Sequence, residues 1–158
     1  MALDPKFVGR KYGPYQYKVG LEKMREFAYA VSGGVPSIGY AGPPQGLNPL
    51  YWDEKVAQDG PHKGVVAFPT FCVTFAIRPF AAAISDPELG VNLLMLVHGE
   101  QELEFFDVMR DGDVMTTTGE IAQLYERNGK DFVIVSTESK NQQGKLVVRG
   151  KWTAVIRS

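Results

Sequence analysis

The chain has 158 residues, of which 44% are hydrophobic and 22% are charged, and its formal net charge is −1. These values predict one globular domain over residues 1–158 with a real core. They give no electrostatic reason to bind nucleic acid or an anionic membrane. No apolar run approaches the roughly 20 residues of a membrane-spanning helix, and the first residues lack the apolar core of a secretory signal. We therefore expect a cytoplasmic protein.

The first expected element is an amphipathic helix over residues 21–32. Leu21, Met24 and Val31 recur at helical spacing opposite charged residues, and two glycines end the pattern. Residues 33–49 hold five Gly and four Pro, which predicts a loop. The segment DEKVAQ, which follows this loop, predicts one helical turn.

Residues 69–87 predict a buried helix. The segment begins with proline, is apolar almost all round, and has Arg78 as its only charge before Asp86. Pro79 is expected to kink or divide the helix because it removes a backbone hydrogen bond. Cys72 is the only cysteine, which excludes an internal disulfide and a thiolate metal cluster, and we expect no metal site. Its apolar surroundings predict a small buried hydrophobe.

From residue 91 onward the apolar residues recur with a period of two, which predicts antiparallel strands. One face of the first strand carries Leu93, Met95, Val97, Leu103 and Phe105, and the other carries His98, Glu100, Glu102 and Glu104. Residues 114–127 predict a second strand, and Asn128-Gly129 predicts a hairpin into a third. After the turn NQQG, a last strand alternates cleanly over residues 146–156.

A strand meander that follows one nearly all-apolar helix predicts the α+β hot-dog fold. Wrapping a curved antiparallel sheet around the long helix is the simplest way to bury that helix. Such a sheet leaves edges exposed, so we expect it to pair with a second copy or with a sister domain.

The stretches VHGEQELEFFDVMRDGDV, at residues 97–114, and AFPTF, at residues 67–71, carry a family resemblance. They resemble the non-catalytic N-terminal half of peroxisomal-type hydratase 2 and its MaoC-like, FAS1-type dehydratase relatives. The resemblance runs from Val8 to Arg157. The chain is also similar to the small subunit of mycobacterial-type (R)-3-hydroxyacyl-ACP dehydratases, which works beside a catalytic sister. The resemblance implies an acyl thioester substrate, carried on CoA or acyl carrier protein, and no other cofactor.

In catalytic members of this family the loop before the buried helix reads Asp-x-Asn-Pro-x-His. The Asp and His position a water and move its proton, and a Gly eighteen residues after the His donates its N–H to the thioester oxygen. In this chain Asn48-Pro49 matches the motif. Gly46 stands at the Asp position, Tyr51 at the His position and Pro69 at the Gly position. A phenol with a pKa of about 10 is a poor base and proline has no N–H, so we expect no catalytic residue here.

Aromatic residues near this loop are consistent both with core packing and with the wall of an acyl-chain tunnel. In addition, a lone histidine on a strand more often makes a structural hydrogen bond than it acts as a base. The candidate acyl-binding residues are Asn48, Tyr51, Trp52, Phe68, Phe71, Phe75 and His98.

Three functions follow from these residues. The first is an accessory, acyl-chain-binding subunit of an (R)-specific 2-enoyl-CoA hydratase or 3-hydroxyacyl-thioester dehydratase, in a heterodimer or heterotetramer whose partner carries Asp-x-Asn-Pro-x-His. The second is a self-sufficient homodimeric hydratase or thioesterase that uses His98 or Tyr51. The third is a non-catalytic acyl-CoA-binding protein. We expect the first, because three active groups are replaced within a matching motif; the acyl chain, its carrier and the oligomer stay open.

Overall fold

A computed structural model of the chain describes residues 3–32 and 46–157. The chain forms two compact units. The first, here called the sheet unit, comprises Met1–Tyr17, Val73–Phe106 and Met115–Ser158. The second, here called the loop unit, comprises Lys18–Cys72 and Asp107–Val114. The expectation that residues 1–158 form one domain stays a prediction.

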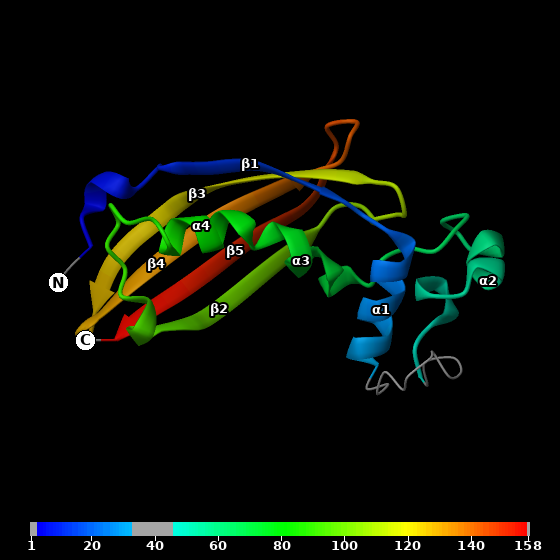
Figure 1. Ribbon diagram of the computed structural model, residues 1–158, viewed down its shortest axis with the longest axis horizontal. Helices are drawn as coiled ribbons and strands as arrows, with labels where there is room; N and C mark the ends of the chain where they lie inside the picture. Colours follow the sequence, from blue (N-terminus) through cyan, green and yellow to red (C-terminus); the bar gives the residue numbers. More distant parts are fainter. Residues whose placement is uncertain (1–2, 33–45, 158) are drawn as a thin grey trace. The chain divides into compact units, whose positions relative to one another are not determined.

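The sheet unit is built on a five-stranded antiparallel sheet with the order β1-β3-β4-β5-β2 (Figure 1). Its strands are β1 (Lys11–Lys18), β2 (Leu96–Phe105), β3 (Val114–Arg127), β4 (Lys130–Lys140) and β5 (Leu146–Arg157). Ile121 of β3 lies opposite Val135 of β4, which in turn lies opposite Trp152 of β5. Directly opposite residues share a face, so this register gives the sheet one continuous apolar face.

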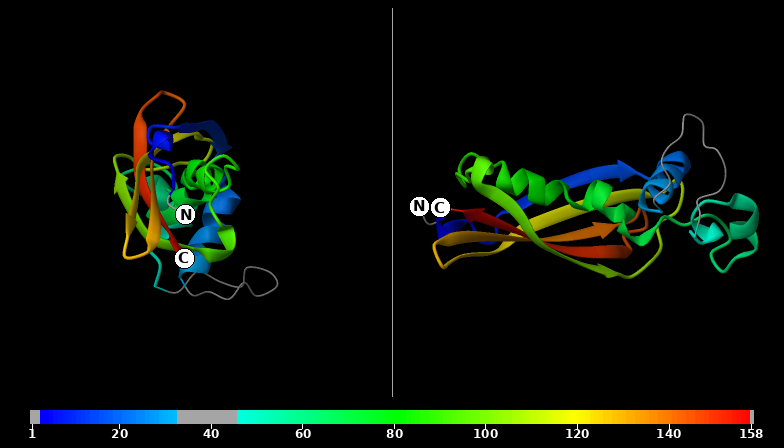
Figure 2. Two further views of the ribbon diagram at one scale, coloured as in Figure 1. Left: turned by 90° about the vertical axis from the view of Figure 1, so that its left-hand side faces the viewer. Right: turned by 90° about the horizontal axis from the view of Figure 1, so that it is seen from below.

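The central helical segment over residues 69–84 consists of η3 (Pro69–Cys72), α3 (Val73–Ala76) and α4 (Arg78–Ile84). Its last two parts, α3 and α4, pack on β4 and run along the apolar face of the sheet (Figures 1 and 2). The helix is divided at Ile77, as predicted, since Pro79 falls in the first turn of α4. A five-stranded antiparallel sheet with a central helix of 16 residues is the predicted hot-dog fold.

The helix approaches the sheet closely at Gly119 of β3. A Cβ at this position would lie 2.6 Å from the Cβ of Pro79 and 2.8 Å from the carbonyl oxygen of Ser136. A real Cβ atom essentially never makes contacts this short. Glycine at 119 therefore sets how deeply α4 can lie against β3 and β4.

Polar side chains on the apolar face of the sheet are paired with one another. Trp152 is fully buried, and its Nε1 donates a hydrogen bond of 3.0 Å to Oγ1 of Thr137. The hydroxyls of Thr117 and Ser139 lie 2.8 Å apart. Because a buried polar group without a partner costs free energy, these pairs fix the relative register of β3, β4 and β5.

The loop unit contains the helices α1 (Leu21–Val31) and α2 (Glu54–Asp59) and the short turn η2 (Pro49–Tyr51). The helices predicted over 21–32 and at DEKVAQ are thus confirmed. Two backbone hydrogen bonds hold the segment before η3 in place: Ala67 N–H donates to Met109 O at 2.8 Å, and Val66 N–H to Leu50 O at 3.2 Å.

Three sequence assignments near the strands differ from the structure. His98 lies opposite Ala154 and shares the apolar face with Trp152, not the face of Glu100, because the pairing register shifts between His98 and Glu100. Leu93 and Met95 do not lie in a strand but in the turn η4 (Leu93–Met95), because Asn92 accepts the N–H of Leu94 and starts a helical turn there. Strand β1, which sequence analysis did not predict, contains Gly13-Pro14. Proline is confined to edge strands, and β1 is the first strand of the sheet order.

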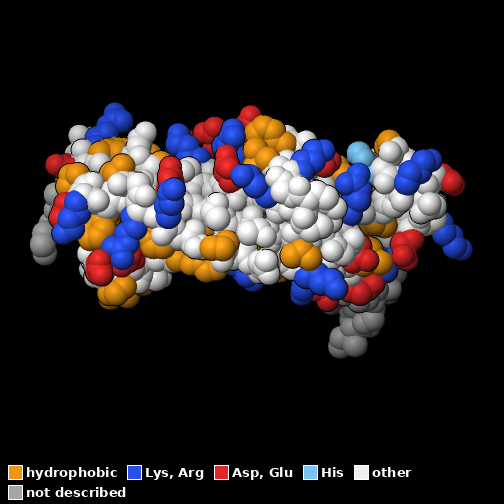
Figure 3. Space-filling model, turned by 90° about the horizontal axis from the view of Figure 1, so that it is seen from above, with side chains coloured by type: hydrophobic (Ala, Val, Ile, Leu, Met, Phe, Trp, Pro, Cys, Tyr) orange, Lys and Arg blue, Asp and Glu red, His pale blue; other side chains and the backbone are white. Residues whose placement is uncertain are grey.

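The surface carries mixed charge. On the face that Figure 3 presents, Lys and Arg side chains alternate with Asp and Glu side chains. Within residues 3–32 and 46–157, no helix has both the length and the apolarity to cross a membrane.

Candidate functional site

The loop that matches the Asn-Pro part of the motif is held by two capping side chains. Asn48 Oδ1 accepts the N–H of Leu50 at 3.0 Å, and Pro49 takes the first position of η2. Asp53 Oδ1 accepts the N–H groups of Lys55 and Val56 at 2.9 and 3.2 Å, which caps α2. Capping residues satisfy backbone donors that a helix start leaves free. Asn48 and Asp53 therefore have structural roles in this loop.

Gly46, Tyr51 and Pro69 occupy the three positions that the resemblance aligns with the Asp, the His and the Gly of the motif. Gly46 is exposed, has a φ of +75°, and offers no carboxylate. Tyr51 ends η2 with a phenol where an imidazole would stand. Pro69 begins η3 and has no N–H, while the N–H of Phe71 is already bonded to Phe68 O at 2.8 Å. A carboxylate, an imidazole and a free backbone donor are thus missing from these positions.

Four aromatic rings form a continuous chain in the loop unit. The ring centroids of Tyr51 and Phe68 are 5.2 Å apart, those of Phe68 and Phe27 are 6.5 Å apart, and those of Phe27 and Phe71 are 5.6 Å apart. The Tyr51–Phe68 and Phe27–Phe71 pairs meet edge to face, a favoured ring geometry. Sequence analysis named Tyr51, Phe68 and Phe71 as candidate acyl-binding residues but missed Phe27. The position of Phe27 on the apolar face of the predicted helix is the signal that could have identified it.

Trp52 lines a surface hollow of about 500 Å³ together with Glu22, Arg25, Tyr29, Asp53, Glu54 and Lys55. Arg25 organises this hollow: its Nε donates to Trp52 O at 3.2 Å, and its guanidinium also bonds Glu22 at 2.7 Å and Glu54 at 2.8 Å. The hydrogen bond with Glu22 raises the pKa of Arg25, although burial opposes the shift. Charged walls of this kind differ from those of an apolar tunnel. The indole Nε1 of Trp52 is buried and has no hydrogen-bond partner among the described residues.

The two remaining candidates, Phe75 and His98, belong to the sheet unit. Phe75 is 1% exposed and stacks on Tyr17 with centroids 5.4 Å apart. The ring of His98 lies 5.4 Å from that of Phe80 and 5.9 Å from that of Trp152. Within the described part of the chain, His98 makes no hydrogen bond or ion pair that would orient it as a base. Both residues contribute to aromatic packing in this unit.

Two further kinds of site were considered: a nucleophile at Cys72 and a cluster of metal-ligating side chains. Cys72 is fully buried, and its burial raises the pKa of the thiol to about 12, so it stays protonated at neutral pH. The prediction of a buried hydrophobe at Cys72 is thus confirmed. In the described ranges, no group of three or more His, Cys, Asp or Glu side chains could hold a metal ion.

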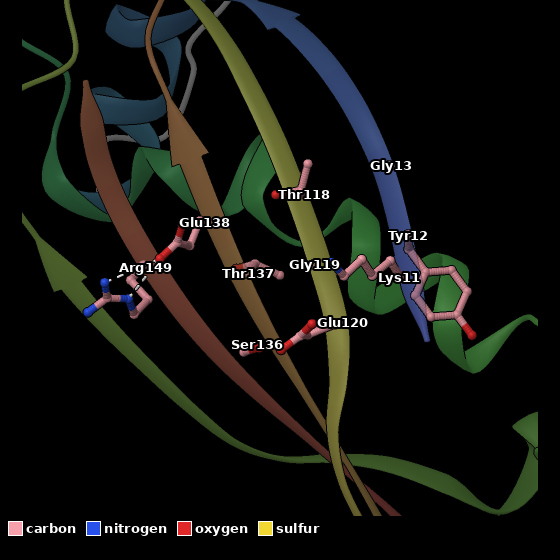
Figure 4. A pocket seen from close by; sticks show the side chains of 10 residues that line it. All are labelled: Lys11, Tyr12, Gly13, Thr118, Gly119, Glu120, Ser136, Thr137, Glu138 and Arg149. Carbon is pink, nitrogen blue, oxygen red and sulfur yellow. Dashed lines mark hydrogen bonds and ion pairs between the residues drawn. The ribbon is translucent and has the colours of Figure 1, made fainter. Parts of the chain in front are cut away.

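A second hollow, of about 440 Å³, lies on the sheet unit where β1, β3 and β4 meet (Figure 4). Most of its lining is polar or charged: Lys11, Tyr12, Gly13, Thr118, Gly119, Glu120, Ser136, Thr137, Glu138 and Arg149. Sequence analysis predicted none of these as site residues. Strand register brings them together, and no local motif signals it.

Comparisons of sequence identify the family of the chain. Residues 6–149 match the sequence pattern of the family described as FAS1-like, dehydratase domain region. A UPF0336 protein of Saccharopolyspora erythraea is 34% identical over 158 residues, which cover 99% of this chain and 93% of that protein.

Solved structures give the same fold. The C-terminally truncated HadBC (3R-hydroxyacyl-ACP dehydratase) complex of Mycobacterium tuberculosis is similar with a TM-score of 0.76 at 24% identity, over 98% of this chain and 99% of that chain. A MaoC-like dehydratase is similar with a TM-score of 0.76 at 26% identity, over 96% of this chain and 42% of that longer chain. A heteromeric complex is therefore among the proteins with this fold.

Proposed function

The chain belongs to the FAS1-like dehydratase domain family, and from that premise we propose that it is the accessory, acyl-chain-binding subunit of an (R)-specific 2-enoyl-thioester hydratase. In the reverse direction the same assembly is a 3-hydroxyacyl-thioester dehydratase. The Asp and His that act on the substrate belong to a partner chain with the motif Asp-x-Asn-Pro-x-His.

The observation that carries this proposal is a loop whose backbone is capped by side chains but which lacks the three groups that act in the motif. Asn48 and Asp53 keep the backbone of the loop in place. Gly46, Tyr51 and Pro69 remove the acid, the base and the oxyanion donor together. Loss of one group would be compatible with a variant mechanism. Loss of all three removes the groups that position the water, move its proton and bind the thioester oxygen in the motif.

The reaction divides between the two chains as follows. On the partner, the Asp and His hold a water, whose oxygen adds to C3 of the enoyl thioester while a proton reaches C2. Dehydration runs these steps backward, and neither direction needs a redox cofactor. This chain supplies apolar surface for the acyl tail, for which the rings of Tyr51, Phe68 and Phe27 are the candidates in the loop unit.

The carrier and the assembly are part of the same proposal. Likeness in fold to the HadBC complex supports a heterodimer or heterotetramer, and the 3R-hydroxyacyl-ACP dehydratase activity of that complex supports a thioester on acyl carrier protein. CoA remains the alternative carrier, because the two share the thioester that the partner's Asp and His act on. We place the assembly in the cytoplasm, which subcellular fractionation would test.

An activity assay with and without a partner tests the proposal directly. The purified chain alone is expected to hydrate neither crotonyl-CoA nor a long-chain enoyl-CoA. Co-expression with hot-dog proteins that carry the motif, from the same source, is expected to yield a complex with turnover. Replacing the motif His of the partner by Ala should abolish that turnover.

Hydration of either enoyl-CoA by this chain alone, at a rate typical of the family, would contradict the proposal. The variant His98→Ala would then decide whether the self-sufficient homodimer uses His98, with His62→Ala as the matched control. Tight binding of acyl-CoA without turnover, with every motif-bearing partner tested, would instead favour a binding protein.

A further inference from the structure

One end of the sheet unit carries three basic side chains in a line across three strands, here called the basic row. Arg127 of β3 lies directly opposite Lys130 of β4, which in turn lies opposite Arg157 of β5. All three are exposed, and directly opposite residues share a face of the sheet. Within residues 3–32 and 46–157, no carboxylate lies within ion-pair distance of any of these cations.

Other cations on the same face of the sheet are neutralised. Arg149 of β5 lies opposite Glu138 and Glu104, and its guanidinium is 3.2 Å from the first carboxylate and 3.0 Å from the second. Lys151 lies opposite Glu102, with Nζ 3.9 Å from the carboxylate. The basic row therefore departs from the charge pairing of the rest of this face.

The acids nearest in the chain do not neutralise the basic row. Glu126 and Asp131 lie opposite each other, and Asp131 also lies opposite Ile156, which is buried. Both carboxylates thus belong to the apolar face, and Glu126 already accepts the N–H of Gly129 at 2.8 Å. Like charges directly opposite each other destabilise a sheet, and an anionic partner would relieve this repulsion.

Apolar side chains adjoin the basic row on the same face. Tyr125, Phe132 and Val155 lie directly opposite one another, two residues inward from the three cations, and Val97 of β2 lies opposite Val155. Tyr125 is 41% exposed, and its ring stacks on that of Phe132 with centroids 4.7 Å apart. This end of the face thus combines unpaired positive charge with exposed apolar surface.

The turn η4 adds two exposed leucines at the same end. Strand β2 begins beside the last residues of β5, as Figure 1 shows near the C-terminus, so η4 lies at the end of the sheet that holds Arg157. Leu93 is 52% exposed and Leu94 is 94% exposed. Asn92 Oδ1 accepts the N–H of Leu94 at 3.1 Å and so fixes the turn that presents them. Their burial against another surface would be favourable.

We propose that this end of the sheet unit docks on an anionic lipid bilayer. The basic row binds the phosphates of the headgroups, and Leu93 and Leu94 enter the boundary between headgroups and acyl chains. Tyr125 suits the interface, because its ring is apolar and its hydroxyl is polar. This inference goes beyond the proposed function and does not depend on it.

The formal net charge of −1 does not oppose this docking. Attraction to a charged bilayer acts within a Debye length of its surface, so the cations at the docking end outweigh the acids elsewhere. Sequence analysis, which used the net charge, gave no reason to expect an anionic membrane. The separation of charge is visible only once strand register brings Arg127, Lys130 and Arg157 together.

A lipid surface fits this end better than an acidic protein does. The cations come from three strands, and the leucines come from a separate turn. Headgroups and acyl chains adjust to any such spacing, whereas a protein partner needs a pocket for Leu94 and carboxylates in matching positions. An acidic polypeptide is therefore the competing occupant that the experiment must exclude.

Vesicle co-sedimentation of the full chain tests the inference. Vesicles of phosphatidylcholine alone are compared with vesicles that also contain phosphatidylglycerol. The variant Arg127→Glu/Lys130→Glu reverses two charges of the basic row, and Leu94→Ser removes the most exposed leucine. The matched control is Lys11→Glu/Lys55→Glu, which changes the net charge equally at exposed lysines outside this end. Thermal unfolding would verify that all three variants fold.

The wild type is expected to bind the anionic vesicles about tenfold or more tightly than the neutral ones, because each basic residue near the surface adds attraction. Arg127→Glu/Lys130→Glu should lose about tenfold or more of this binding for the same reason. Leu94→Ser should weaken it severalfold, and the control variant should bind like the wild type. High salt should weaken the binding of the wild type, since exposed charges are screened.

Two results would overturn the inference. One is a wild type that binds the anionic vesicles no more tightly than the neutral ones, or no more tightly than Arg127→Glu/Lys130→Glu does. The other comes from soluble poly-L-glutamate as a second probe: if it binds through the basic row while anionic vesicles do not, an acidic polypeptide is the occupant. Because neither readout is turnover, failure here leaves the proposed function standing, and failure of the activity assay leaves this inference standing.

Discussion

The sheet unit and the loop unit hold their polar side chains in different ways. In the sheet unit, Trp152 of β5 and Thr137 of β4 bond each other in the core, so their contact depends on the register of two strands. In the loop unit, Asn48 and Asp53 bond backbone groups two or three residues away along the chain. The first kind of contact spans the fold, whereas the second is local.

Under the proposed function, this difference explains how the family fold can persist without the family chemistry. Side chains that no longer act can be exchanged in the loop unit, because nearby caps hold the backbone without them. Gly46 and Tyr51 stand at such positions, and neither supplies a cap. A comparable exchange in the sheet unit would disturb several strands at once.

The largest expected effect comes from removing Trp152. Trp152→Ala should lower the free energy of unfolding by about 3–5 kcal/mol, because it opens a cavity in the core and leaves the Thr137 hydroxyl without its donor. Urea denaturation followed by circular dichroism would measure the change. Trp52→Ala is the matched control, and it should cost less because Trp52 is partly exposed. Equal costs would contradict the contrast between the two units.

A smaller effect is expected at the cap of α2. Asp53→Ala should cost about 1 kcal/mol of stability, because two backbone N–H groups lose their acceptor. Asp53→Asn keeps an acceptor oxygen at the same place and should recover most of the loss. Thermal unfolding of the two variants would measure this difference. If the two variants unfolded alike, local capping would not be what holds this loop.

The smallest effect is expected for Tyr12, which donates a hydrogen bond of 2.9 Å to Asp86. Burial alone would raise the pKa of Asp86, but the bonds from Tyr12 and from the Glu88 N–H, with the charge of Arg10, outweigh it and lower the pKa below 3.8. Tyr12→Phe should therefore lower the free energy of unfolding at neutral pH, by less than Asp53→Ala does.

The pH dependence of that cost follows from the sign of the shift. A lowered carboxyl pKa gives stability that is present above the pKa of the unfolded chain and is lost as pH falls through the folded value. The difference between wild type and Tyr12→Phe should thus be full above about pH 5 and shrink below pH 4. Urea titrations across this range would measure it, and a constant difference down to low pH would exclude a role for the Asp86 charge.

Strong local patterns made most of the fold predictable. The bounds predicted for β3 agree with the structure, and both residues of the Asn128-Gly129 hairpin have positive φ, as that turn type requires. Pro79 correctly marked the division of the central helix. Strand β1 escaped prediction because Gly13-Pro14 argues against a strand, and only pairing at the sheet edge overrides that local preference.

The candidate site was predictable only as an alignment of residue types. The motif showed that Gly46, Tyr51 and Pro69 lack a carboxylate, an imidazole and a backbone N–H, because these absences follow from residue type alone. It did not show that Asn48 and Asp53 act as caps. Nor did it show that Phe27 joins the aromatic chain, because that contact depends on how α1 lies against the loop.

The separation of capping residues from the vacated positions makes the loop suitable for engineering. The two caps occupy Asn48 and Asp53, so an acid and an imidazole could be grafted at Gly46 and Tyr51 without touching either cap. Apart from Gly46 itself and its two chain neighbours, no described residue has an atom within 4 Å of the place that a Cβ would take at Gly46. Asp is also among the few residues that visit its left-handed backbone conformation readily. The chain is thus a scaffold on which the minimal set of groups for thioester hydration can be assembled one at a time.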